Sequence, residues 1–323
     1  MTYSISSVGL QLQVTTSLQN QQNTLALLNQ QLASGVQHSD LTGYTPPQAQ
    51  SLLNYQSIIT QRQAYISGMQ SVSPRLSVYD STMTDIESLT QQASTLATQN
   101  QTYDANTASQ IQAQAKAYLQ QMQDDLNQQV GGRYIYAGSR YTTQPVTDLT
   151  TLGAPTLPFT PTTSPTLTDY DTEYNPPTTT TDAAAYAQDS VTVDSSFSVQ
   201  YGVTSNSPGF QQVIAGLRLI NAAASQSNPN TFNTDMIAAA KLLNQGLSAV
   251  QGVHAGVAGN INILKQQTDQ QNSDITALQN QISGIQNVDT TTLGTELTLL
   301  QTQLQASYSS TATIIQNSIL KYL

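Results

Sequence analysis

The chain has 323 residues, with 9 lysines and arginines against 19 aspartates and glutamates, a formal net charge of −10 and no cysteine. So few basic residues cannot form the positive stripe that a nucleic-acid backbone requires, nor the cluster that holds an anionic membrane surface. The lack of cysteine excludes disulfides and thiol chemistry. No apolar run approaches the ~18 residues of a membrane span, and the first residues lack the basic and apolar segments of a conventional secretory signal. We therefore expect no nucleic-acid partner, no membrane insertion and no Sec-type leader.

A first helix is predicted to end at Ser34 and Gly35, because glycine can adopt the left-handed conformation that closes a helix. Apolar residues fall on positions a and d of a heptad repeat, with Gln21 as the polar exception; they are Val14, Leu18, Leu25, Leu28 and Leu32. An isolated helix is marginal in water. This stripe must therefore pack on the protein's own core, on the other end of the chain, or on the same helices of other subunits.

Two longer apolar seams indicate a helical rod. One covers residues 58–97 and contains Pro74, which predicts a kink. The other covers residues 236–285 in alternating steps of three and four, which gives a rod of roughly 75 Å at about 1.5 Å per residue. Between them, a third helix is predicted to begin at a cap on Asn106 or Thr107 and to end at the pair Gly131-Gly132.

The sequence from about residue 141 to 208 is rich in threonine and proline and carries little helix signal. Two stretches in or beside it are predicted strands. "RYIYAG" follows the glycine pair, and "VTVDSSFSVQYGV" alternates apolar residues on one face, Phe197 among them.

The last predicted helix carries an apolar stripe like that of the first. Its leucines begin with the spacing 4-3-4, and the stripe comprises Leu293, Leu297, Leu300, Leu304, Tyr308, Ile315, Ile319 and Leu323. These patterns predict a mainly α fold, in which a long antiparallel helical stalk carries a small β-rich head at its far end. The predicted parts are a terminal coiled coil (1–46 with 288–323), a helical rod (47–131 with 206–287) and a β-rich inserted domain (132–205).

The sequence offers little catalytic chemistry. Its two histidines, His38 and His254, are far apart and show no metal-ligand spacing. Asp124 and Asp125 are adjacent on a helix and point in different directions, so they are not a pair for acid–base work. We therefore predict no catalytic, cofactor-binding or metal-binding residues and no enzyme. His254 falls on the second rod seam, where we expect a polar element that fixes register.

The two chain ends resemble those of bacterial flagellins and flagellar hook-associated proteins. Residues 286–323 have that family's aspartate-marked break, a T-E-L-like opening at Glu296-Leu297 and a leucine-rich tail, and "LNQQLASG" at 28–35 is similar to the motif that ends the family's first helix. Within the family, "GGRYIYAGSRYTTQPV" at 131–146 resembles a signature of the hook–filament junction proteins that introduces their β-rich domain. The matching residues of this domain-junction motif are Gly132, Arg133, Tyr134, Tyr136 and Gly138.

This resemblance implies a structural protein without a cofactor, whose terminal helices pair as a coiled coil inside a tubular polymer. The implied partners are further copies of the chain, a neighbouring hook-associated protein, flagellin, an export chaperone and the flagellar type III export apparatus. The implied location is extracellular, at the hook–filament junction. The alternative is a flagellin, the main filament subunit, and a filament-displayed adhesin in the β-rich head fits the sequence less well.

Overall fold

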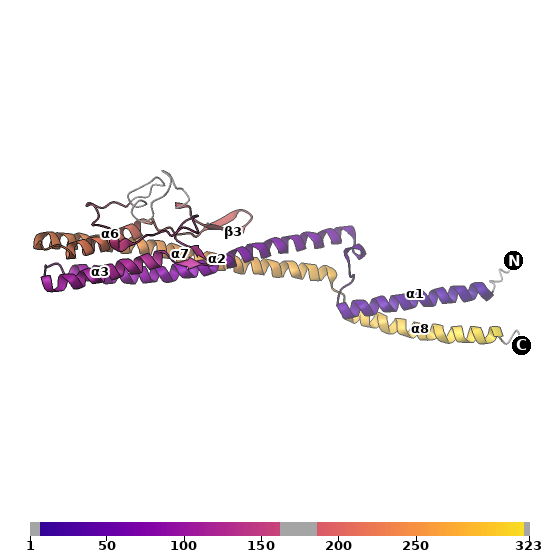
Figure 1. Cartoon of the computed structure of the whole chain (residues 1–323). Helices are drawn as coiled ribbons and strands as arrows, with labels where there is room; N and C mark the ends of the chain where they lie inside the picture. Colours follow the sequence, from indigo (N-terminus) through magenta and orange to yellow (C-terminus); the bar gives the residue numbers. More distant parts are fainter. Residues whose placement is uncertain (1–6, 162–185, 320–323) are drawn as a thin grey trace. The chain divides into compact units, whose positions relative to one another are not determined.

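A computed structural model describes residues 7–161 and 186–319, and the chain forms two compact units (Figure 1). The first unit comprises Met1–Gln61 and Ser273–Leu323, and the second comprises Arg62–Asn272. Two long helices contribute to both units: α2 (Pro46–Gln99) and α7 (Pro229–Gln286). The boundary between the units therefore falls within these helices, and the three-part division of the sequence stays a prediction.

In the first unit, the two end helices lie side by side and antiparallel. α1 (Ser7–Ser34) packs along α8 (Thr290–Ile319), so the start of α1 and the end of α8 lie at the same end of this pair (Figure 1). The predicted end of α1 is confirmed: Gly35 has a φ of +73°, and its N–H donates to the carbonyl of Gln31 at 2.8 Å. A short helix, η1 (Leu41–Gly43), follows and is capped by Asp40.

The two chain segments that follow α1 and precede α8 are bound to each other. Val36 and Asn287 form an isolated antiparallel bridge. The N–H of Gln37 donates to the carbonyl of Gln286 at 2.7 Å, and the N–H of Val288 donates to the carbonyl of Gly35 at 3.1 Å. These backbone bonds fix where α1 ends relative to where α8 begins, and so set the register of the pair.

The second unit is a helical bundle with a tightly packed core. α3 (Ala105–Leu126) packs on α6 (Pro208–Ala224), while α2 and α7 are joined by Ser94, whose hydroxyl donates to Asn244 at 2.9 Å. Most of α6 is buried, because α3 and α7 pack against it. The largest fully buried side chains include Tyr79, Tyr136, Phe210, Phe232, Met69, Leu76, Met83, Ile86, Leu119 and Met122. The seam predicted over residues 58–97 supplies many of them, and α2 continues as a helix through Pro74.

α6 and α7 approach closely because glycines lie at their contact. A Cβ on Gly209 of α6 would come within 2.8 Å of the backbone nitrogen of Val250, and one on Gly246 of α7 within 2.9 Å of that of Val213. Both distances are too short for real carbon contacts, so these positions accept glycine alone without a shift of the backbone.

Two predicted helix boundaries are wrong. α3 is capped by Asp104, which accepts from the N–H of Asn106 at 2.9 Å, and not by Asn106 or Thr107. α3 ends at Leu126, before the glycine pair. Gly131 and Gly132, with φ of +61° and +76°, instead form the turn of a hairpin between β1 (Gln129–Val130) and β2 (Arg133–Tyr134). A two-residue hairpin turn favours two residues with positive φ, which glycine provides.

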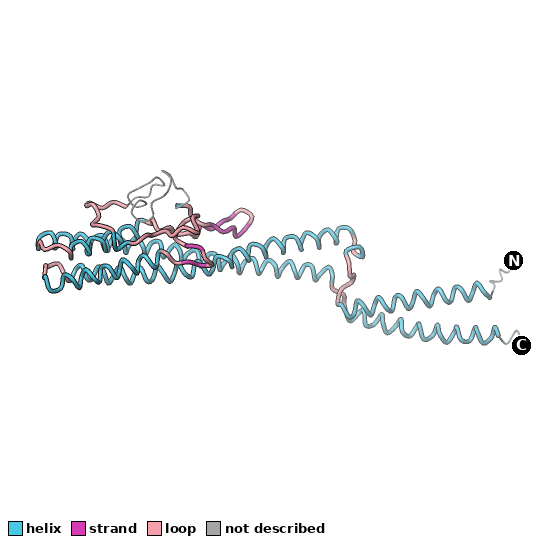
Figure 2. The backbone as a smooth tube through the Cα atoms, viewed as in Figure 1, coloured by secondary structure: helices cyan, strands magenta, loops and turns pink. Residues whose placement is uncertain are grey.

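The inserted segment holds a second hairpin that lies beside the bundle. β3 (Ser190–Asp194) pairs antiparallel with β4 (Phe197–Gln200), and both lie close to α7 (Figure 2). The side chain of Gln271 donates to the carbonyl of Val193 at 3.0 Å, and that of Asn260 donates to the carbonyl of Gln200 at 2.9 Å. The β3–β4 hairpin therefore packs on the side of α7, because the buried valines of β3 need cover, and not at the far end of a stalk. Phe197 is 46% exposed, since the strand turns there.

Candidate assembly surface and insertion motif

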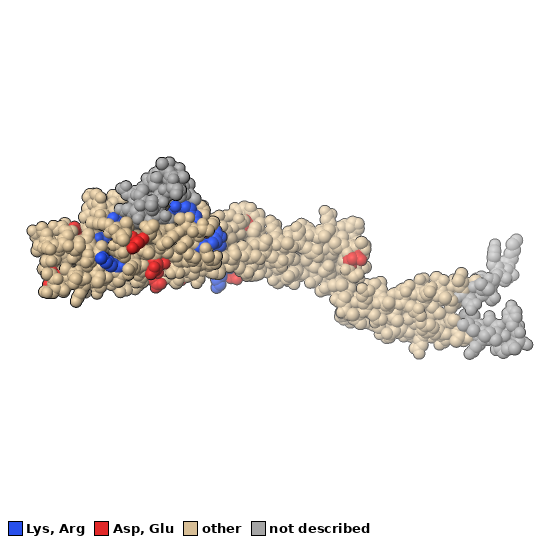
Figure 3. Space-filling view, viewed as in Figure 1, with Lys and Arg blue, Asp and Glu red and all other residues tan. Residues whose placement is uncertain are grey.

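The pair of α1 and α8 is almost free of charge. α1 contains no charged residue, and α8 contains only Glu296. Figure 3 shows the contrast: blue and red side chains gather on the second unit, and the described surface of the pair is nearly uniform. None of the described helices combines the length and the apolar character needed to cross a membrane. Contacts made by this surface must therefore depend on apolar burial and on amide and hydroxyl hydrogen bonds.

The predicted stripe residues differ in how well the pair covers them. Leu28, Leu293 and Leu304 are buried, whereas Leu32 and Tyr308 are exposed. The half-buried members are Val14, Leu18, Leu25, Leu297 and Leu300. Ile315 and Ile319 lie in the last turns of α8, where side chains are outside the described part, and Leu323 lies outside the described residues. The two helices thus cover only part of their stripes by packing on each other.

Further leucines of the pair point into solvent. Leu12 is 71% exposed, Leu27 50% and Leu299 59%. The prediction missed them because they lie off the heptad stripe. The leucine pairs Leu27-Leu28 and Leu299-Leu300 could have revealed them. Adjacent residues lie about 100° apart around a helix, so when one leucine of a pair packs inward the other cannot.

A groove lies on the surface of α1 near α8. It has a volume of about 540 Å³ and is lined by Leu12, Thr16, Asn20 and Leu300, among others. Gln21, the predicted polar exception in the stripe, also lines it, and its Oε1 is buried without a hydrogen-bond partner among the described residues. Across the pair, the side chain of Gln22 donates to the hydroxyl of Tyr308 at 2.8 Å. The surface thus combines exposed leucines with neutral polar groups.

The predicted domain-junction motif lies in the second unit, where the inserted segment leaves the helices. Gly132 is in the hairpin turn, and Gly138 has a φ of +62°. The guanidinium carbon of Arg133 lies 3.4 Å from the ring centroid of Tyr141, a cation–π contact. The N–H of Tyr134 donates to the carbonyl of the same Tyr141 at 2.9 Å. The motif therefore folds back on the residues that directly follow it.

Tyr136, the motif's fully buried member, joins both ends of the insertion to α2. Its hydroxyl hydrogen-bonds to that of Thr82, and its ring packs edge to face on Tyr79, with the centroids 5.0 Å apart. The carbonyl of Tyr136 accepts from the N–H of Ser205 at 2.9 Å. Burial raises the pKa of both Tyr79 and Tyr136, so both hydroxyls stay protonated.

The hydroxyl of Tyr79, on α2, also connects the two ends of the insertion. It hydrogen-bonds to the carbonyl of Ile135 on the outgoing segment and lies 3.3 Å from the carbonyl of Val203 on the returning segment. Tyr79 and Tyr136 thus form a tyrosine clasp, which holds the two ends of the insertion together against one helix.

A polar cluster that the sequence did not predict lies at the base of the insertion. Arg75 of α2 donates to the hydroxyl of Tyr201 at 2.8 Å and lies 3.8 Å from the carboxylate of Asp189. Tyr141 donates to the other oxygen of Asp189 at 2.8 Å, and this hydrogen bond, more than burial, raises the pKa of Tyr141. Tyr201 and Asp189 of the returning segment therefore contact Arg75, and Tyr141 of the outgoing segment joins them through Asp189.

Comparison with known proteins gives one family match and a shared fold. Residues 241–323 match the family model for the bacterial flagellin C-terminal helical region. No curated protein matches the chain. A structure assigned as a flagellar hook-associated protein from Vibrio parahaemolyticus is 14% identical, with 75% of this chain and 98% of that chain covered and a TM-score of 0.54. FlgL of Bacillus cereus is 14% identical, with 72% and 100% covered and a TM-score of 0.49.

The family match confirms the predicted flagellin-like character of the C-terminal part. The Vibrio structure, 98% of which aligns with 75% of this chain, confirms the predicted fold class of a helical stalk with a small β region.

Proposed function

We propose that this chain, whose residues 241–323 match the family model for the flagellin C-terminal helical region, is a structural component of the bacterial flagellum that joins the hook to the filament. One observation supports this most: the paired end helices α1 and α8 are nearly uncharged and leave leucines exposed. A monomer in water gains nothing from such a surface, whereas neighbouring subunits would bury it.

The assembly follows from the kind of contact such a surface makes. Leu12, Leu27 and Leu299 are presented by the pair and are covered by helices of other subunits. Contacts between different surfaces of successive subunits do not close on themselves, so they generate a helical polymer. A junction subunit meets a different partner on each side: a neighbouring hook-associated protein and flagellin. Export through the flagellar type III apparatus, with a chaperone that covers the end helices, places the chain outside the cell.

The exposed leucines provide a direct test. Leu27 and Leu299 are replaced together by aspartate; because each is already half exposed, the stability of the monomer should fall by only about 1 kcal/mol per substitution. Flagella in cells that produce this variant should lack the protein. The matched control replaces Gln30 and Thr302, exposed polar residues of the same two helices, by aspartate. Incorporation of the leucine variant at the wild-type level would refute the proposed surface.

A second experiment separates the junction role from the alternative. The family model is that of a flagellin region, so a main filament subunit is the competing function. Immunogold electron microscopy of intact flagella, with antibody against residues 141–208, should give one cluster of gold where the hook meets the filament. Label along the whole filament would establish a flagellin instead, and flagella without label would overturn both.

A further inference from the structure

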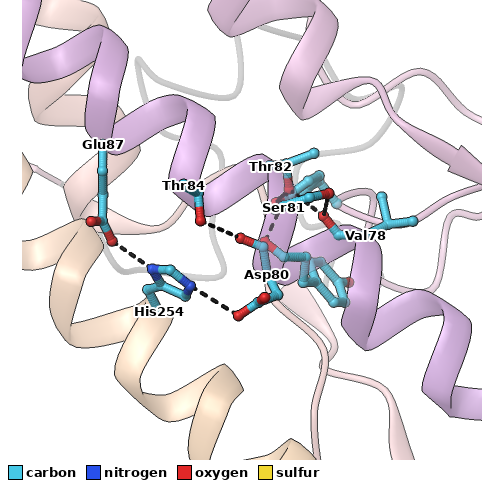
Figure 4. A network of polar contacts seen from close by, with 9 residues as sticks. Val78, Asp80, Ser81, Thr82, Thr84, Glu87 and His254 are labelled. Atoms are coloured by element: carbon cyan, nitrogen blue, oxygen red, sulfur yellow. Dashed lines mark hydrogen bonds and ion pairs between the residues drawn. The ribbon is translucent and has the colours of Figure 1, made fainter.

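His254 of α7 lies between two carboxylates of α2. Its Nδ1 is 2.6 Å from Oε1 of Glu87, and its Nε2 is 3.1 Å from Oδ1 of Asp80 (Figure 4). Asp80 and Glu87 are seven residues apart, about two helical turns, and so lie on one face of α2. The imidazole is therefore held at both of its nitrogens by the same helix.

This geometry selects one protonation state. A neutral imidazole has a single N–H donor, and its other nitrogen can only accept a hydrogen bond. An ionised carboxylate has no donor at all. Both contacts can be hydrogen bonds only when the ring carries two protons. When one proton leaves, a nitrogen lone pair faces a carboxylate oxygen, and one attractive contact becomes repulsive.

The surrounding charges leave His254 as the only cation of this cluster. Among the described residues, no lysine or arginine lies within ion-pair distance of Asp80 or Glu87, and Arg75, further along α2, is taken up by Asp189 and Tyr201. The nearest charges on α7 are Lys241 and Lys265, and Lys265 lines a pocket with Asp80 without forming an ion pair with it. On α2, Asp85 adds a third carboxylate between Asp80 and Glu87 in the sequence. α6 begins against Val250 and brings no titratable group in residues 208–212.

The three side chains are neither sealed from water nor arranged around a metal. The side chains of His254 and Glu87 are 22% and 20% exposed, so protons exchange with solvent. The carboxylates lie on opposite sides of the ring (Figure 4), and in the described residues no group of three such side chains is placed to hold a metal ion. The shared ligand of this cluster is therefore the proton.

We propose that His254, Asp80 and Glu87 form a proton-operated clamp, in which the imidazolium ties α2 to α7 and the loss of its proton loosens the two helices at this level. The clamp belongs to the second unit and does not depend on the surface of α1 and α8, which belongs to the first. Burial opposes the charge on His254, but the hydrogen bonds to Glu87 and Asp80 outweigh it, so the pKa of His254 lies above its ordinary value. Stability from the clamp is therefore fully present below the pKa of an unfolded histidine, ~6.5, and is lost as pH rises through the folded pKa.

The titration of His254 tests the first half of the proposal. The chain has two histidines, so imidazole NMR signals of the full chain are few, and His38→Gln assigns them. Between about pH 5 and about pH 9, His254 should titrate above ~6.5. Glu87→Gln and Asp80→Asn should each lower its midpoint. An unchanged midpoint in both variants would overturn the charge pairing.

Hydrogen exchange tests whether the proton holds the helices. In the wild type, amides of residues 80–87 and 250–258 should lose protection as His254 deprotonates, by roughly tenfold, the size expected for one charge-assisted hydrogen bond. Exchange in His254→Gln at each pH supplies the reference, and His38→Gln should behave as the wild type. If His254→Gln fails to fold, Glu87→Gln replaces it and should reduce the change. If amide protection falls with pH equally in the wild type and in the variants that lack the histidine–carboxylate contacts, the clamp is refuted.

Discussion

Asp125 gives the sharpest test of the energetics of the second unit. It lies in the last turn of α3, is 8% exposed, and its Oδ2 is buried without a hydrogen-bond partner among the described residues. Burial, and then repulsion from Asp85 and Asp124, raises the pKa of Asp125 from 3.8 to about 7. The folded protein therefore binds this proton more tightly than the unfolded chain does.

The sign and size of the effect follow from this shift. Because the folded pKa is the higher one, the folded state loses stability as pH rises from about 4 to about 7. The full shift of about 3 units corresponds to ~4 kcal/mol, of which about 2.5 kcal/mol falls between pH 5 and pH 8. Asp125→Asn keeps the shape of the side chain and removes its ionisation. The free energy of unfolding of the wild type should thus fall by about 2.5 kcal/mol more than that of Asp125→Asn between these two pH values.

Urea unfolding at pH 5 and pH 8 measures this difference. The chain has 16 tyrosines and no tryptophan, so near-UV circular dichroism reports on buried tyrosines such as those of the clasp. Taking the difference between two pH values cancels the cost of burying the amide. Asp124→Asn is the matched control: it removes an exposed carboxylate that is only a minor cause of the raised pKa of Asp125, so most of the pH dependence should remain. Equal pH dependence of the wild type and Asp125→Asn would show that Asp125 is not strained by its burial.

Three further changes test other contacts. Tyr136→Phe removes the hydrogen bond to Thr82 from the clasp and should lower the free energy of unfolding in urea by about 1 kcal/mol. An unchanged free energy of unfolding would show that this hydroxyl does not stabilise the insertion. Gly246→Ala should destabilise the second unit by about 2 kcal/mol, because the added methyl group clashes with α6. Gly252→Ala is the control on the same helix: its methyl group meets open space, and it should stabilise the protein by about 0.5–1 kcal/mol. Equal effects of the two substitutions would contradict the close approach of α6 and α7. Hydrogen bonds from the side chain and N–H of Thr292, then from the N–H of Thr291, lower the pKa of Asp289, so the start of α8 should lose amide protection as pH falls through that folded pKa, and Asp289→Ala should show no such loss.

The elements with a repeating pattern were predictable. The heptad spacing in the first and last helices indicated two stripes that need a partner, and α1 and α8 pack on each other. Periodicity says which face of a helix is apolar, but not how much of that face a single partner covers. For this reason Leu28 and Leu32 looked alike in the sequence, although one is buried and the other 41% exposed.

The errors arose where one local signal fits two structures. Gly131 and Gly132 have positive φ, which suits both the end of a helix and the turn of a hairpin. Asp104 and Asn106 can both cap a helix, so the start of α3 was ambiguous by two residues.

The polar clusters were beyond sequence reasoning for another reason. Arg75 meets Tyr201 across 126 residues of chain, and His254 meets Asp80 across 174. Helical spacing relates only residues within the same helix. Such pairs are set by how the helices are arranged in space, which no single stretch of the sequence contains.

The cluster on Arg75 makes the inserted segment a closed loop, since Tyr141 and Asp189 are hydrogen-bonded to each other where the chain leaves and where it returns. The entropy lost on closing a loop grows only with the logarithm of its length, so doubling the chain between these two residues would cost about 0.6 kcal/mol. The stability of the helical bundle would be almost unaffected. Foreign peptides could therefore be spliced between Tyr141 and Asp189, and lineages could lengthen, shorten or exchange this segment, while the bundle that carries it keeps its shape.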